Sequence, residues 1–162
     1  MDLVLEMHFF IIAVGQMKEP FYLAAQEEYC KRLSRYARVT IQEVADDPVP
    51  RGEKDRLYVK ERQGERLLKK APGCFSVAVD PRGKALSSEE LASWMGEQFN
   101  SGRGDLAFFL GGTLGLPDSV LRHADYILSL SRLTFPHQLA RIIVLEQLYR
   151  ALRILNNEPY HY

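Results

Sequence analysis

The sequence predicts an α/β fold, with a mainly parallel sheet flanked by helices. Five short segments with strand patterns, four of them apolar runs and one alternating, are interspersed with longer stretches in which apolar residues recur at helical spacing. The 162 residues are 46% hydrophobic and 26% charged, which is ordinary for a globular domain. We therefore expect a single domain over residues 1–162, in which strands and helices alternate along the chain.

The first half contains two predicted strands and two predicted helices. Residues 8–15 (HFFIIAVG) form a continuous apolar run that ends at a glycine, which predicts a buried strand followed by a turn. Helical spacing predicts a helix over 20–36, and the alternation of residues 39–44 (VTIQEV) predicts the next strand. The run ADDPVPRGE then interrupts regular structure, and a charged helix is expected from about residue 54 to residue 70.

The second half continues the alternation and ends in a long apolar helix. Ser87 or Ser88 is a suitable N-cap for its first helix, because two glutamates follow in the first turn. Thr134 is a candidate cap for the last helix, with Pro136 in the first turn. The predicted elements are a strand over 74–80, a helix from the serine cap through 99, a strand over 106–112, a short helix over 117–123, a strand over 126–130 and a helix over 136–155.

Charge and cysteine content argue against several classes of protein. Lys and Arg together number 21, as do Asp and Glu, so the chain is not a general binder of DNA or of another polyelectrolyte. The apolar runs are too short to span a bilayer, and Asp2 and Glu6 are atypical of a secretory signal. Cys30 and Cys74 lack metal-ligand spacing, and we expect them to be reduced thiols in the cytoplasm.

Positive charge is nevertheless concentrated in two segments. Residues 51–70 contain eight Lys or Arg against four Asp or Glu, and Lys31, Arg32, Arg35 and Arg38 form a second cluster. A solvated helix face explains such clusters more often than an RNA-binding surface does. Both interpretations stay open at the level of the sequence.

A ligand site is expected beyond the C-terminal ends of the strands, where open parallel sheets bind ligands. Three loops are predicted there, at residues 80–84, 111–116 and 129–136. The glycine turn GGTLG lacks the spacing and the lysine of a phosphate-binding loop, and the four histidines are too scattered to predict a metal site. His137 and Arg141 are one turn apart and share a face of the last helix. From these residues alone, the sequence predicts a small-molecule cleft.

Five segments resemble one known family. They are AVGQMKEPFYLAAQEEYCKRLSRY, VAVDPRGKALSSEELA, FFLGGTLGL, LSLSRLTFPHQLARIIVLEQLYRA and NEPYH. In this order and spacing they are similar to the ribosomal RNA large subunit methyltransferase H family, of the SPOUT class. The resemblance runs from about residue 7 to residue 161, so residues 1–6 precede the expected start: either they are an extension or Met7 is the true initiator.

The resemblance implies an enzyme, a cofactor and a fold. The enzyme would use S-adenosylmethionine to methylate N3 of a pseudouridine, at position 1915, in 23S rRNA. The implied fold has a C-terminal trefoil knot, which the general rules of chain connection do not predict. Two alternatives stay open: a SPOUT ribose methyltransferase that acts on tRNA, and a non-catalytic factor that binds the ribosome.

The resemblance also indicates which residues form the site, and it implies no metal. Around the target base we expect His137, Arg141, Tyr160 and His161, with Arg141 favouring the developing anion and Tyr160 stacking on a base. Backbone groups and apolar side chains would contact the cofactor. These contacts are expected at Val79, Gly111, Leu130, Ser131, Arg132, Leu133, Thr134 and Phe135.

The expected partners are a second copy of the chain and 23S rRNA, in the large subunit or the assembled ribosome. In the homodimer, the tail of one protomer (residues 158–162) is expected to help complete the partner's site. The last helix supports a subunit contact, because its apolar residues exceed a single stripe. These residues are Leu139, Ile142, Ile143, Leu145, Leu148, Leu152 and Leu155.

Overall fold

Five strands form one sheet in the computed structural model, which describes residues 7–159. The order is β2-β1-β4-β3-β5, and the pairings of neighbouring strands are parallel. β1 and β4 lie inside the sheet and are buried along most of their length, which explains their continuous apolar sequences. The strands are β1 (His8–Val14), β2 (Arg38–Val44), β3 (Phe75–Ala85), β4 (Asp105–Leu110) and β5 (Tyr126–Ser129).

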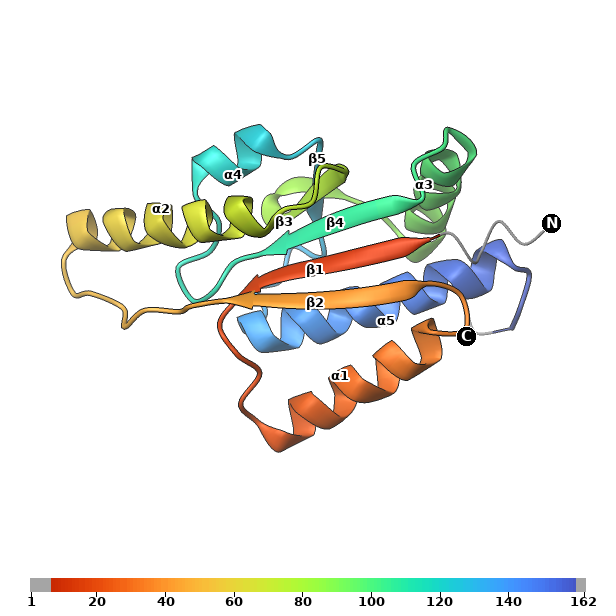
Figure 1. Ribbon diagram of the computed structural model, residues 1–162, viewed down its shortest axis with the longest axis horizontal. Helices are drawn as coiled ribbons and strands as arrows, with labels where there is room; N and C mark the ends of the chain where they lie inside the picture. Colours follow the sequence, from red (N-terminus) through yellow and green to blue (C-terminus); the bar gives the residue numbers. More distant parts are fainter. Residues whose placement is uncertain (1–6, 160–162) are drawn as a thin grey trace.

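Helices cover both faces of the sheet, so the predicted α/β fold is confirmed (Figure 1). On one face, Leu33 of α1, Leu91 of α3 and Leu145 of α5 join the larger hydrophobic cluster. On the other face, Leu67 of α2 and Val120 of α4 belong to a second cluster. The helices are α1 (Pro20–Leu33), α2 (Glu53–Lys70), α3 (Ser88–Asn100), α4 (Asp118–His123) and α5 (His137–Leu155).

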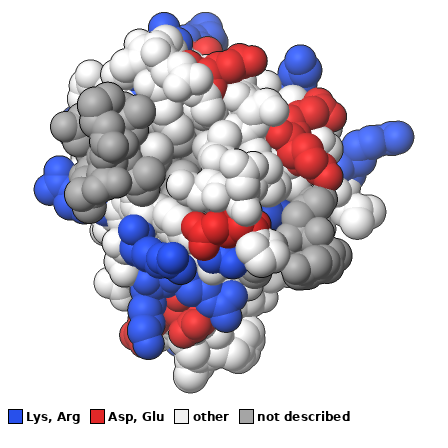
Figure 2. Space-filling view, turned by 90° about the vertical axis from the view of Figure 1, so that its right-hand side faces the viewer, with Lys and Arg blue, Asp and Glu red and all other residues white. Residues whose placement is uncertain are grey.

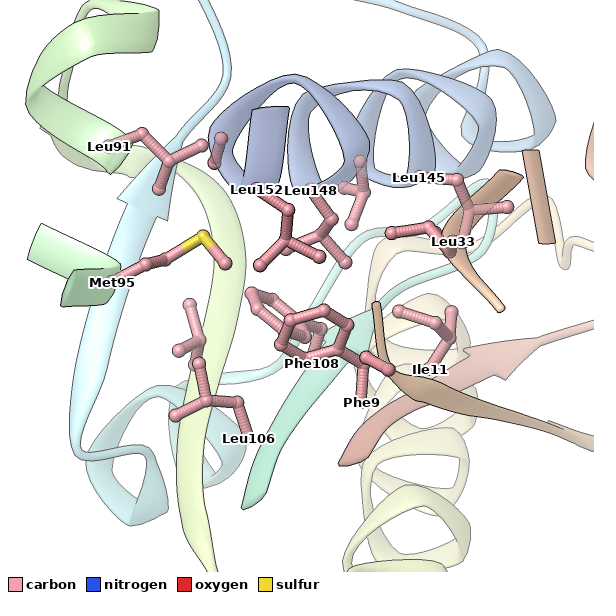
Figure 3. Close-up of a cluster of buried hydrophobic side chains, with 14 of the residues drawn as sticks. Phe9, Ile11, Leu33, Leu91, Met95, Leu106, Phe108, Leu145, Leu148 and Leu152 are labelled. Carbon is pink, nitrogen blue, oxygen red and sulfur yellow. The ribbon is translucent and has the colours of Figure 1, made fainter. Parts of the chain in front are cut away.

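The larger cluster fixes α5 against the sheet (Figure 3). Phe9 of β1 and Phe108 of the neighbouring strand β4 lie at its centre with their rings edge to face and their centroids 6.2 Å apart. Leu148 and Leu152 of α5 pack against them from above in this view. Burial of each such side chain stabilises the fold by about 1.5–3 kcal/mol. The packing therefore determines where the start of α5 lies relative to the ends of the strands.

The predicted elements are all present, with small differences at their ends. α1 ends at Leu33 instead of residue 36. Ser87, one of the two predicted caps, does cap α3, because its hydroxyl accepts a hydrogen bond from the Glu90 amide (3.1 Å). The predicted cap at Thr134 is wrong: Pro136 occupies the N-cap position of α5, so Thr134 lies two residues too early to reach the first free amides.

β3 contains a bulge within the segment that was predicted as a loop. Val79 and Lys84 both pair with Leu128 of β5, so residues 80–83 leave the ladder and the strand then resumes. A Cβ atom on Gly83 would lie 2.5 Å from the carbonyl carbon of Ile127. Only glycine allows this close approach, which holds the bulge against β5.

The apolar residues of α5 are mostly buried inside the protomer. Ile142, Leu145, Leu148 and Leu152 are at most 8% exposed, because α5 lies against α1, α3 and the sheet. Leu139 and Ile143 are only half-buried, so part of the apolar surplus stays at the surface of the protomer. Leu155 is 37% exposed. The homodimer itself stays a prediction.

The single domain over residues 1–162 and the trefoil knot stay predictions, and residues 1–6, which precede the expected start, lie outside the described residues. Between residues 7 and 159, no helix is both long enough and apolar enough to cross a membrane.

Candidate active site

A cavity of about 250 Å³ lies at the C-terminal ends of β3, β4 and β5. Its walls come from the three loops that the parallel-sheet rule predicted, together with the start of α5. Residues of the lining are 79–81, 110–116, 130, 131, 133–135, 137 and 140. Chain segments that are distant in sequence therefore meet at one site.

The first wall is the glycine turn after β4. A Cβ atom on Gly111 would lie 2.5 Å from the carbonyl carbon of Gly115, closer than real Cβ atoms approach backbone. Gly115 has a φ of 81°, which favours glycine, and it forms an isolated bridge with Gly112. Gly111 was predicted to approach the cofactor closely. In the structure, the absence of a side chain on Gly111 allows its backbone to lie against the backbone of Gly115, which closes the turn.

The second wall is the bulge of β3, which Arg82 ties to the glycine turn. Arg82 Nε and Nη2 donate to both carboxylate oxygens of Asp80, at 2.9 and 3.1 Å. The same guanidinium donates to Asp118 Oδ1 (2.9 Å) and to the carbonyl oxygen of Leu116 (3.1 Å). One side chain thus holds two walls of the cavity at a constant separation.

Asp80 is buried at the base of this arrangement, and its charge is stabilised there. Burial alone would raise the pKa of its carboxyl group. Hydrogen bonds from the side chain and the backbone amide of Arg82, with the positive charge, outweigh burial and lower the pKa below its usual value. Asp80 is therefore an anion whose charge is already paired, and it is available mainly to position the loop.

The third wall is the loop between β5 and α5, whose hydroxyl groups bind the loop's own backbone. Ser129 Oγ donates to the Ser131 carbonyl oxygen (3.1 Å), and Ser131 Oγ accepts from the Leu133 amide (3.0 Å). These bonds explain why the segment is rich in serine. Leu133 is 71% exposed although it lines the cavity, so an apolar side chain stands at the mouth.

The chain's relationships agree with this geometry. Residues 7–161 match the family model described as "Predicted SPOUT methyltransferase". The chain belongs to the SPOUT methyltransferase family. A relative from Pelotomaculum thermopropionicum, named Ribosomal RNA large subunit methyltransferase H, is 49% identical over 96% of this chain and 99% of its own length. A relative of the same name from Clostridium kluyveri is 46% identical over the same shares.

A solved structure supports the fold of this SPOUT methyltransferase. A tRNA (m1G37) methyltransferase from Aquifex aeolicus matches it with a TM-score of 0.55 and 16% sequence identity. The match covers 96% of this chain and 74% of the other. At that identity, the likeness shows the fold alone.

The SPOUT methyltransferase gathers most of the residues that were predicted to contact the cofactor. Seven of the eight line the cavity, and Arg132 does not. His137, predicted to lie near the target base, also lines the cavity. Tyr160 and His161 lie outside the described residues. Asp80 and Pro81 also line the cavity; they belong to the predicted loop 80–84 but were not among the expected cofactor contacts, although an aspartate directly after a buried strand, followed by Pro-Arg-Gly, was a signal for an anchored loop.

Arg141 has a different position from the predicted one. It is only 2% exposed and does not line the cavity. Its Nη1 donates to Glu43 Oε2 (2.6 Å) and Gln26 Oε1 (3.2 Å), and its Nη2 donates to the carbonyl oxygen of Gly15 (3.0 Å). Glu43 Oε2 also accepts from the Met17 amide (3.0 Å). In this SPOUT methyltransferase, Arg141 thus joins α5 to α1, to β2 and to the turn after β1.

Two further properties bear on the chemistry of the SPOUT methyltransferase. Among residues 7–159, no three His, Cys, Asp or Glu side chains gather as metal ligands would. Burial raises the pKa of both Cys30 and Cys74, so these thiols are poor nucleophiles at neutral pH. Among the ionisable side chains of the described residues, His137 and the paired Asp80 line the cavity.

Proposed function

We propose that the protein uses S-adenosylmethionine to methylate N3 of a pseudouridine in 23S rRNA of the large ribosomal subunit. The near full-length identity to two proteins named Ribosomal RNA large subunit methyltransferase H supports this activity. The observation that carries the proposal is the convergence of seven expected cofactor residues on one cavity. These residues come from segments that are far apart in the sequence, and the resemblance had indicated them as one site.

The cavity residues fit this cofactor. Leu130, Leu133 and Phe135 offer apolar surface for an adenine ring, and the backbone of the glycine turn and of residues 130–135 offers hydrogen-bonding groups. Arg82 holds the two other walls apart before any ligand arrives. When bound, S-adenosylmethionine supplies an electrophilic methyl group.

The chain's own residues would orient the base and accept one proton from it. N3 of pseudouridine bears an imide proton, which must leave before or during the attack on the methyl group. His137 lines the cavity and is the candidate to accept that proton. Arg141 is buried against Glu43, so its proposed effect on the anion would act through the position of α5. The roles of Tyr160 and His161 stay predictions.

Methyl transfer should be measured with S-adenosylmethionine labelled in the methyl group. The RNA substrates are naked 23S rRNA, large subunits and assembled ribosomes that lack the modification, and mass spectrometry of nucleosides locates the methyl group. A His137→Ala protein should lose about 10²-fold in rate and keep its cofactor affinity. The matched control is His123→Ala, because His123 is exposed and lies outside the cavity.

Two results would support other functions. A methyl group found on a tRNA ribose would favour the tRNA enzyme. Failure to bind S-adenosylmethionine even at millimolar concentration, measured by isothermal titration, would favour a non-catalytic factor that binds the ribosome.

We also propose that the active form is a homodimer with a site shared between protomers. Leu155, at the end of α5, leaves apolar surface that a second copy could cover. Light scattering at micromolar concentration should give the mass of a dimer, and a monomer mass would contradict the proposal. After subunit exchange, an inactive Tyr160→Ala protein and an inactive Gly111→Ala protein should recover activity together, because one site in the mixed dimer is intact.

A further inference from the structure

The N-terminal half of α2 projects from the body of the protein. Residues 51–58 are all exposed, whereas the buried residues of the helix, Gln63, Gly64 and Leu67, lie in its second half. Figure 1 shows the first turns of α2 extending beyond the ends of the strands and beyond α4. Most helical stability in proteins comes from a packed apolar face, and these turns have no such face within the described chain.

The second half of α2 packs near the cavity, and the projecting half extends away from it. A Cβ atom on Gly64 would lie 2.4 Å from Pro117 Cγ, so α2 packs directly on Pro117, next to Leu116 of the cavity lining. Ser119 Oγ donates to Glu61 Oε2 (2.9 Å) one turn earlier. A polymer that approached the cavity mouth from this side would therefore meet α2.

The outward face of α2 combines positive charge with an aromatic ring. Lys54, Tyr58, Arg62 and Lys69 are exposed and lie along the face opposite the buried residues, with Glu65 as the acidic member between them. We call these five residues the α2 stripe. Tyr58 is 62% exposed, and Arg62 Nη1 donates to its hydroxyl group (3.0 Å). At 1.5 Å per residue, the stripe is about 22 Å long, enough to follow several phosphates of one strand.

The cations of the α2 stripe have few close partners within the protein: Arg62 donates to Tyr58, and it interacts with Asp47 at longer range. None of the ion pairs formed within residues 7–159 involves Lys54, Arg62 or Lys69. In a chain of zero net charge, residues 51–70 contain eight Lys or Arg and four Asp or Glu. A local excess of positive charge therefore lies on α2, which extends away from the cavity.

The second basic cluster differs in this respect. It lies at the other end of the sheet, where Figure 2 shows positive side chains beside negative ones. Arg32 pairs with Glu28 (3.0 Å), and Arg35 lies 3.7 Å from Glu158, which also binds Arg153. Two of the cluster's arginines therefore already have carboxylate partners.

We infer that the α2 stripe is a docking surface for ribosomal RNA, with the cations on phosphates and Tyr58 stacked on an unpaired base. The inference rests on the proposed function for the identity of the RNA. Phosphate neutralisation supplies most of the affinity of such contacts, and exposed aromatic rings bind single-stranded bases. The stripe would hold the RNA while the cavity acts on one nucleotide.

The test compares two triple variants that each remove three positive charges. The first is Lys54→Gln, Arg62→Gln and Lys69→Gln, and the matched control is Lys31→Gln, Arg35→Gln and Arg38→Gln at the opposite end. Binding to purified bacterial ribosomes is measured by co-sedimentation between about 50 and 200 mM salt, where counterion release is steep. The stripe variant should bind about tenfold more weakly and lower the slope of log K against log salt by about 3. The control should change the slope by less than about 1.

Single variants of Tyr58 test the ring. Tyr58→Ala should weaken binding about fivefold or more, and Tyr58→Phe, which keeps the ring, should bind as the wild type does. Cofactor affinity should stay unchanged in all variants, which shows that the cavity is intact.

The outcomes separate this inference from the proposed function. Wild-type affinity in the stripe variant, or an equal loss in the control, would overturn the inference even if methylation is observed. A loss confined to the stripe variant would support it even if no methyl transfer occurs, because binding is measured without turnover. Conversion of a dimer to a monomer by the stripe variant would overturn it in favour of a subunit contact.

Discussion

A Gly111→Ala protein should fold but fail to bind S-adenosylmethionine. The new Cβ atom would lie 2.5 Å from the carbonyl carbon of Gly115 and 2.8 Å from its oxygen, so the backbone of the turn must move. These atoms are main chain and cannot rotate away as a flexible side chain would. Displacement of a binding loop by about 1 Å is enough to reduce function by about 10²-fold, and this turn forms one wall of the cavity. Isothermal titration should show no saturation below millimolar cofactor.

The control for this experiment is Gly73→Ala. A Cβ atom on Gly73 would have no neighbour within 4 Å, so the same chemical change is harmless there. Circular dichroism should show native secondary structure in both proteins, because Gly111 lies beyond the end of β4. Wild-type cofactor affinity in a folded Gly111→Ala protein would show that the cofactor binds elsewhere.

Replacement of Arg141 by methionine should lower the free energy of unfolding by about 3 kcal/mol, the low end of the cost of breaking a buried ion pair. The Glu43 side chain is 31% exposed, so water can partly replace the lost cation. The carbonyl oxygen of Gly15 and the amide oxygen of Gln26 would also lose their donor. Urea titration followed by circular dichroism should show a lower midpoint with an unchanged slope.

Two further variants test the cause of this loss. Arg141→Lys keeps the charge but not the fork of donors, so its stability should fall between those of the wild type and Arg141→Met. A double variant, Arg141→Met with Glu43→Gln, should be less destabilised than the sum of the single changes, because no unpaired charge remains. Wild-type stability of Arg141→Met would contradict a structural role and return Arg141 to the candidates for direct catalysis.

The order of the elements and the position of the cavity could be predicted from the sequence. Apolar runs such as residues 8–14 have the continuous pattern of strands buried on both faces, and the structure buries β1 accordingly. A serine cap at Ser87 or Ser88 was recognisable because glutamates follow it within the first turn, and the structure selects Ser87. The rule that ligands bind beyond the C-terminal ends of parallel strands selected the three loops of the cavity.

The remaining features depend on contacts between distant segments. Helical periodicity shows that His137 and Arg141 share a face, but it does not show which one meets a loop and which one meets Glu43, 98 residues away in sequence. Likewise, Pro-Arg-Gly has the composition of an ordinary turn. Only the approach of Gly83 to β5, and the bonds from Arg82 to the glycine turn, make it a bulge. The resemblance to a known family assigned residues to the cavity that local patterns could not assign.

The central position of β4 also has a consequence for synthesis of the protein. β1 lies between β2 and β4, and its pairing with β4 joins His8 to Asp105. During translation, one edge of β1 therefore stays unpaired and apolar until β4 has left the ribosome. Long-range parallel pairing is slow because loop closure must precede the gain from contacts. The recovery of folded protein should depend more on temperature and chaperones during this interval than on the stability of the finished fold.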